Sequence, residues 1–186
     1  MKKALIAIAA TMTLAACSGG EKAEEAMTEE TAMAADEGPS DTQIAHIAYT
    51  AGNIDIAYAT LALEKSKNAE VRKFAQLMLQ DHKAVNELAL ALLAKLGAEA
   101  EDNDTSKALA ADGEKKLAEL KALDGAAFDK AYAENELAYH QFVNKTVEES
   151  FIPAVDNAEF KDLLGEGLKI FKVHEGHAEA MVKAVG

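Results

Sequence analysis

Apolar residues recur every three or four positions through most of the chain after residue 40. This spacing places them on one face of an α-helix. The first stripe follows Ser40-x-x-Gln43, which has the form of a capping box at a helix N-terminus. A second stripe lies between Asn68, which is suited to an N-cap, and Gly97, which is suited to a helix end. The pattern therefore predicts two long amphipathic helices before residue 97.

Three further helices are expected, over about residues 105–123, 126–150 and 157–185. Pro153 is expected to stop the second of these, because proline lacks a backbone N–H. No segment alternates convincingly with a period of two, so strands are not expected. The stretch over residues 97–125 is long enough to run from one end of a helix bundle to the other. This favours an all-α, ferritin-like four-helix bundle, in which a short crossover helix joins two antiparallel hairpins, over an up-and-down bundle with a short loop.

The first sixteen residues have the organisation of a lipoprotein signal peptide. Lysines at positions 2 and 3 precede an apolar stretch over residues 4–14, which is too short to span a membrane. Residues 14–17, Leu-Ala-Ala-Cys, resemble a bacterial lipobox, in which a peptidase cuts before a cysteine that carries lipid. The alternative is an ordinary secretory signal with an incidental cysteine. By resemblance to enterobacterial lipoproteins, Ser18 favours export to the outer membrane. We therefore expect an outer membrane lipoprotein, anchored through Cys17, whose domain faces the periplasm.

Residues 17–40 contain many glutamates, few large apolar residues, and Gly-Gly and Gly-Pro pairs. Such a segment cannot bury a core, so a disordered acidic tether is expected. The predicted organisation is a signal peptide over residues 1–16, a lipidated cysteine with its tether over 17–40, and a helical bundle domain over 41–186.

Charge and composition exclude several functions. The formal net charge is −13, from 32 acidic and 19 basic residues. General nucleic-acid binding is therefore not expected, because it needs clustered Lys and Arg. Cys17 is the only cysteine, which excludes an internal disulfide and a multi-cysteine zinc site. No Ser-His-Asp or Cys-His constellation and no Gly-rich phosphate loop is recognised, so an enzyme is not expected. Protein partners are not predicted.

Several candidate metal ligands fall at similar heights in the predicted bundle. Asp55, His82 and His140 lie about midway along their helices. His174 falls in the apolar stripe near the middle of the last helix, and His177 lies one turn further on. Mid-length positions on antiparallel helices share one height, whichever way each helix runs. Three histidines and an aspartate are thus expected to converge in one layer, which is how bundle cores build metal sites.

Two interpretations of this layer remain open. In the first, the imidazoles bind one transition-metal ion (zinc, copper or iron), and His177, Asp55 or Asp81 is a further ligand or a hydrogen-bond acceptor for a ligand. In the second, a polar layer of His, Asp and Tyr fixes the register of the helices. Asp81 lies in the core stripe just before His82, where it would accept from a histidine of another helix or pair with Lys or Arg. His46 lies off its stripe and is expected at the surface.

Several short motifs occur together in this chain. They are Gly52-Asn53-Ile54-Asp55, Val71-Arg72-Lys73-Phe74-Ala75, Leu77-Met78-Leu79-Gln80-Asp81-His82, Phe128-Asp129-x-x-Tyr132, His140 eight residues later, and His174-x-x-His177-Ala178. The set resembles a widespread bacterial family of domains of unknown function, over about Asp41 to Val185. Members are often labelled outer membrane proteins and placed with ferritin-like folds, and typically carry Glu where Asp55 stands. The resemblance implies fold and location rather than activity, because the family has no agreed activity.

The histidines do not fit the pattern of a di-iron protein. A carboxylate-bridged di-iron site uses Glu-x-x-His on two helices. The residues three positions before the candidate histidines are Leu79, Leu137 and Phe171, and Glu136 lies four before His140. A mononuclear, His-rich site is therefore favoured over a ferroxidase. Two functions follow as hypotheses: a periplasmic metal-binding lipoprotein, and a structural or interaction module in envelope homeostasis or stress tolerance.

Overall fold

The computed structural model describes residues 38–186, and this part of the chain is helical, with no strand. The expected signal peptide, the lipidation site Cys17 and nearly all of the expected tether lie outside the described residues. In chain order the elements are α1 (Asp41–Lys65), α2 (Ala69–Lys95), α3 (Asp104–Lys121), α4 (Gly125–Thr146), the π-helical segment η1 (Val147–Phe151), α5 (Ile152–Ala154) and α6 (Ala158–Val185). None of the helices within residues 38–186 combines the length and hydrophobicity needed to cross a membrane.

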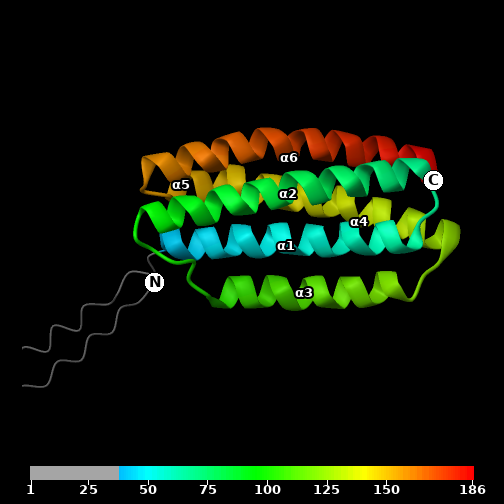
Figure 1. Cartoon of the computed structure of the whole chain (residues 1–186), viewed down its shortest axis with the longest axis horizontal. Coiled ribbons are helices and arrows are strands. Elements are labelled where there is room, and N and C mark those ends of the chain that lie inside the picture. Colours follow the sequence, from blue (N-terminus) through cyan, green and yellow to red (C-terminus); the bar gives the residue numbers. More distant parts are fainter. Residues whose placement is uncertain (1–37) are drawn as a thin grey trace, which may run out of the picture. The chain divides into compact units, whose positions relative to one another are not determined.

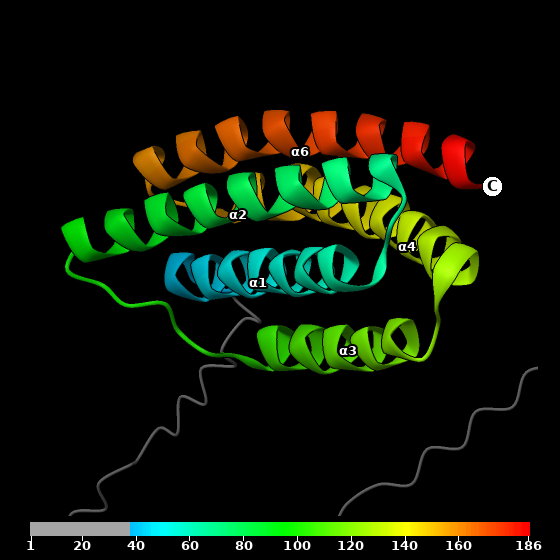
Figure 2. The same ribbon diagram turned by 45° about the vertical axis from the view of Figure 1, so that its right-hand side comes forward.

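The four long helices lie side by side, as Figures 1 and 2 show. α1 packs against α2 to form one antiparallel hairpin, and α4 packs against α6 to form a second. α3 lies outside these four and packs along α1, running from the end where α2 finishes to the end where α4 begins (Figure 1). The segment between α2 and α4 therefore joins opposite ends of the helices, as its length indicates.

The helix ends follow local signals in the sequence. The Ser40 side chain accepts from the Gln43 backbone N–H, and the Gln43 side chain accepts from the Ser40 N–H, which is the predicted capping box. The Asn68 side chain accepts from two N–H groups in the first turn of α2. Gly97 follows α2 with φ of 68°, a left-handed conformation that glycine adopts without strain.

Pro153 does not stop the fourth helix, contrary to the sequence-based prediction. After α4 the chain widens into the π-helical turn η1 and then stays helical through Pro153 to Ala154. The backbone N–H of Ile152 bonds to the Val147 carbonyl, five residues earlier. Pro153 then lies in the first turn of the short helix α5, where a missing N–H is tolerated. The π-helical turn thus shifts the hydrogen-bond register before Pro153, so the missing N–H of the proline does not end the helix there.

The apolar core consists of two clusters. One lies toward the α1–α2 turn, and its large side chains include Tyr58, Phe74, Met78, Phe128, Tyr132 and Met181. The other lies toward α5, and its large side chains include Ile44, Leu92, Leu93, Phe151, Phe160 and Leu164. Buried polar residues occur at mid-length of the four long helices: Asp55, His82, Glu136, His140 and His174. Most of the buried acidic and histidine side chains thus lie at one height of the domain, whereas Asp129 is buried near the start of α4 and accepts a hydrogen bond from Ser66.

Two glycines of this region allow close helix contacts. A Cβ atom at Gly52 would clash with the amide of Asn86, so Gly52 lets α2 approach α1 next to Asp55. The same amide donates to the Asn53 side chain at 3.1 Å. A Cβ atom at Gly113 would lie 2.8 Å from Cγ1 of Ile54, so Gly113 lets α3 lie against α1. These contacts hold the Gly52–Asp55 turn between two neighbouring helices.

Candidate metal centre

Three histidines from three helices meet at the centre of the domain. His82 comes from α2, His140 from α4 and His174 from α6. Their ring centroids are 6.0 Å apart for His82 and His140, 5.4 Å for His82 and His174, and 5.5 Å for His140 and His174. One ring nitrogen from each lies within 4.8 Å of the other two. The convergence expected from their mid-helix positions is therefore present.

Hydrogen bonds fix the tautomer of two of these rings. His140 Nδ1 lies 2.9 Å from the backbone carbonyl oxygen of Glu136, and a carbonyl only accepts, so Nδ1 carries the hydrogen and Nε2 the lone pair. His174 Nε2 donates to Asp81 Oδ2 at 2.9 Å, which leaves the lone pair on Nδ1. Metal-binding histidines usually make such a bond through the nitrogen that does not bind the ion.

Each of the three rings has one buried nitrogen without a hydrogen-bond partner. These atoms are His82 Nε2, His140 Nε2 and His174 Nδ1. Burial lowers the pKa of His82 and His174 to about 4 and also lowers the pKa of His140, so the three imidazoles are neutral at neutral pH. Buried polar atoms normally find a partner. Three neutral imidazoles that lie together, each with a buried nitrogen that lacks a partner, have the chemistry of a transition-metal site.

Two buried carboxyl groups lie beside the imidazoles. Asp55 Oδ2 is 3.4 Å from His82 Nε2, and Glu136 Oε2 is 3.7 Å from His140 Nδ1. One ligand atom each of Asp55, Glu136 and His140 lie within 4.8 Å of one another. Burial raises the pKa of Asp55 to about 6 and raises the pKa of Glu136 well above its usual value. In residues 38–186 neither carboxyl has an ion pair with Lys or Arg, so the ionised form of each would lack a fixed cation.

Aromatic side chains restrict the orientation of the imidazoles. Phe171 stacks on His82 with ring centroids 5.1 Å apart and planes 6° from parallel. Phe74 and Tyr139 meet the His140 ring edge-on, at 6.0 and 6.4 Å. Such packing holds the donor nitrogens in place before any ligand binds.

Glu136 is a member of this cluster that was not predicted as a site residue. Its side chain is fully buried, and it precedes His140 by four residues on the same face of α4. That spacing is the sequence signal for it. A Glu-x-x-x-His pair on a predicted core face places a carboxyl and an imidazole next to each other.

Asp81 and His177 occupy different places from the three histidines. Asp81 lies at the edge of the cluster with 26% of its side chain exposed, so His82, not Asp81, faces the centre. Asp81 nevertheless accepts from His174, one of the two partners expected for it. His177 is exposed and lies outside the cluster. His177 is displaced by about 60° from His174 around α6, and at this position it lies on the exposed side of the helix.

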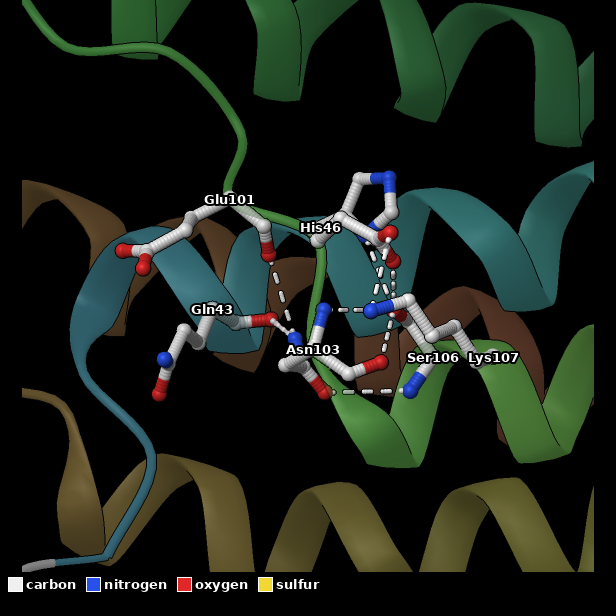
Figure 3. A network of polar contacts seen from close by, with 7 residues as sticks. Gln43, His46, Glu101, Asn103, Ser106 and Lys107 are labelled. Carbon is white, nitrogen blue, oxygen red and sulfur yellow. Dashed lines mark hydrogen bonds and ion pairs between the residues drawn. The ribbon is translucent and has the colours of Figure 1, made fainter.

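His46 belongs to a separate polar network at the start of α3, shown in Figure 3. Its Nδ1 lies 3.0 Å from Ser106 Oγ, and its side chain is 25% exposed. The expectation of a surface residue is therefore only partly met, because the crossover segment packs over this side of α1. The Asn103 side chain caps α3 in the same network and also donates to the Gln43 carbonyl of α1.

Comparisons with known proteins agree with the family resemblance of the motifs. No curated protein and no solved structure gives a significant match to this chain. A family model described as a domain of unknown function, DUF4142, matches residues 24–181. This range begins within the expected tether and includes every residue of the histidine and carboxyl cluster. The chain therefore belongs to the DUF4142 family of domains of unknown function.

Proposed function

We propose that this protein is a membrane-anchored periplasmic lipoprotein whose ferritin-like four-helix bundle binds one transition-metal ion between His82, His140 and His174. The observation that carries the proposal is the convergence of three buried imidazoles, each of which has a nitrogen without a hydrogen-bond partner. Leaving such atoms unpaired costs about 1–3 kcal/mol each. Coordination to an ion would satisfy all three at once.

Charge balance supports a cation at this place. Asp55 and Glu136 are 2% and 0% exposed, and both are close to the imidazoles. Two ionised carboxylates in a buried site repel each other and lose their hydration. A divalent ion would neutralise both, and either carboxylate could complete a coordination shell begun by three imidazoles. Asp81 would hold His174 in the tautomer that binds through Nδ1.

The donor set favours zinc, copper or iron over magnesium or calcium. Imidazole nitrogen suits the first group, whereas magnesium and calcium prefer oxygen ligands. Three imidazoles with one or two carboxylates also differ from the paired Glu-x-x-His motifs of di-iron bundles. A single ion with a largely nitrogen shell is therefore the proposed occupant.

The test is elemental analysis of untagged protein purified after supply of zinc, copper or iron, with magnesium as the comparison. We expect roughly one zinc, copper or iron ion per chain, and no stoichiometric magnesium. Substitution of His82, His140 or His174 should remove the ion. Protein that stays metal-free under every supply would refute the proposal.

A second candidate function is a structural or interaction module without metal, serving envelope homeostasis or stress tolerance. It is favoured by direct polar bonds that already join the helices, such as His174 to Asp81 and Asn86 to Asn53. In that case the polar layer fixes helix register. This function would be selected if the protein binds no metal under any supply and if replacing the carboxyl groups of the layer with neutral side chains destabilises the fold.

Membrane anchoring is tested by changing Cys17. Cys17→Ala should prevent lipidation and move the protein from the membrane fraction to the soluble periplasmic fraction, because a lipid anchor is the proposed membrane contact. Immunoblots of separated inner membrane, outer membrane and periplasm measure this. Ser18→Asp is the matched variant and should stay membrane-bound but leave the outer membrane. Wild-type protein found wholly in the soluble fraction would contradict anchoring.

A further inference from the structure

An apolar pocket of about 520 Å³ opens next to the candidate metal centre. Its walls come from α1, α2, α3, α4 with η1, and α6. Asp55 and His82 line one end, and Phe151 and Phe160 line the part toward α5. From Ile47 to Asp55 on α1 the pocket follows about 12 Å of helix, at 1.5 Å per residue. It is therefore elongated along the helices.

The size of this pocket is unusual for a structural void. Protein interiors are close-packed, and their voids are few and rarely exceed a water molecule. Binding pockets for small molecules measure about 300–1,000 Å³ and have mostly apolar walls. The walls here are formed mainly by aliphatic and aromatic side chains, among them Leu109, Val143, Val147, Leu164 and Phe171. An apolar ligand would remove this surface from water, which is favourable.

The polar groups of the pocket indicate what its ligand carries at one end. Asp55 and His82 are 2% and 4% exposed, and Asp55 Oδ1 and His82 Nε2 have no hydrogen-bond partner. Asp104 and Asp112 are exposed acidic residues of the pocket wall on α3. No lysine or arginine within residues 38–186 lines the pocket. An anionic head group would meet carboxylates and no positive charge, whereas a hydrogen-bond donor would satisfy Asp55.

We propose that the pocket binds a single-chain apolar molecule whose head group donates a hydrogen bond and carries no negative charge, with the head at Asp55 and the chain along η1 and α6. Alkyl amines and alkyl alcohols share this chemistry. The inference goes beyond metal binding and does not require it, because the pocket walls and the Asp55 acceptor belong to the chain itself. A molecule bound there would lie directly against His82.

The experiment uses the full-length protein in the presence of a chelator and the uncharged fluorescent probe N-phenyl-1-naphthylamine. Dodecylamine, dodecanol and dodecanoate, each below its micelle concentration, are compared as competitors with matched tails. We expect the amine and the alcohol to displace the probe at concentrations at least about tenfold lower than dodecanoate, equivalent to 1.4 kcal/mol or more. Equal competition by dodecanoate would overturn the proposed head-group preference.

Variants then locate the binding site. Ala108 is an exposed pocket residue of α3, and Ala111 is exposed on the same helix outside the pocket. Ala108→Trp should fill the pocket and raise the concentrations of amine and alcohol needed to displace the probe at least about tenfold. Ala111→Trp should leave these concentrations unchanged. Asp55→Asn should reduce the difference between the amine and dodecanoate. Unchanged binding to folded Ala108→Trp would overturn the location.

The competitor comparison on wild-type protein needs no variant to fold. Because every titration contains chelator, a negative result here leaves the metal measurements intact. Conversely, a protein that never binds metal can still show the expected order of competitors. The two proposals therefore fail independently.

Discussion

Replacing His140 with alanine is expected to abolish the stabilisation that bound metal gives the folded protein. His140 is 2% exposed, its Nε2 has no hydrogen-bond partner, and it is one of the three converging histidines. A metal at 100 times its Kd stabilises the folded state by about 2.7 kcal/mol. For a domain of this size each kcal/mol raises Tm by roughly 2–4 °C, so the metal should raise the wild-type Tm by about 5–10 °C. Circular dichroism melts with chelator and with excess zinc measure this difference.

The metal-dependent difference in Tm is the readout, because loss of a buried side chain lowers Tm in any buffer. His177→Ala is the matched control. His177 lies on α6 but is exposed and outside the cluster, so this variant should keep the full shift. A shift that survives in His140→Ala, or disappears equally in His177→Ala, would contradict the proposed ligands.

Asp55→Asn is expected to stabilise the metal-free protein at neutral pH and to weaken its response to metal. Burial raises the pKa of Asp55 from 3.8 to about 6 in the folded state. The folded protein therefore binds more protons at Asp55 than the unfolded chain does between these values, and stability falls as pH rises from 3.8 to 6. Ionisation of Asp55 therefore lowers the free energy of unfolding by about 3 kcal/mol above this pH window and has no effect below it. Asparagine keeps the shape and removes the ionisation.

Urea denaturation with chelator, at pH values from 4 to 8, measures the difference between the two proteins. The free energy of unfolding of Asp55→Asn should exceed that of the wild type only slightly near pH 4, and by about 3 kcal/mol at pH 7. Both proteins keep the three histidines, so histidine protonation affects both in the same direction and largely cancels in the comparison. Added zinc should stabilise the variant less than the wild type, because a neutral amide is a weaker ligand and leaves more charge unbalanced.

Asp112→Asn provides the control for this experiment, since Asp112 is exposed on α3 and lies outside the metal cluster. It should change stability by less than about 0.5 kcal/mol at any pH. If Asp55→Asn is instead destabilising at every pH and unaffected by zinc, the buried carboxyl serves helix register, as the structural alternative requires. A stability gain without metal, at the expense of the metal response, is typical of a functional site.

Features that depend on a few neighbouring residues could be predicted from the sequence. Ser40 and Asn68 cap their helices and Gly97 follows the end of α2, because capping uses side-chain and backbone groups only two or three residues apart. The shared height of His82, His140 and His174 also follows from sequence position alone, since rise per residue is constant along a helix.

Features that depend on the rotation of each helix were decided only by tertiary packing. An apolar stripe is wide, so it does not show which of two adjacent residues faces the centre, and His82 rather than Asp81 does so. For the same reason the sequence did not show that Glu136 is buried or that His177 is exposed. Adjacent residues are about 100° apart around a helix, so the rotation of each helix about its axis decides which of them is a ligand.

The sequence by itself determined the helical class, the capped ends of α1 and α2 and the height at which the ionisable residues meet, because these follow from local hydrogen bonds and constant helical rise. Tertiary structure decided which nitrogen of each imidazole is left without a partner, which carboxyls are cut off from water, and where the packing leaves a 520 Å³ pocket. It also decided how Pro153 is accommodated, in a short helix that follows a π-helical turn. Such properties arise between helices distant in the chain, and they exist only once those helices are packed together.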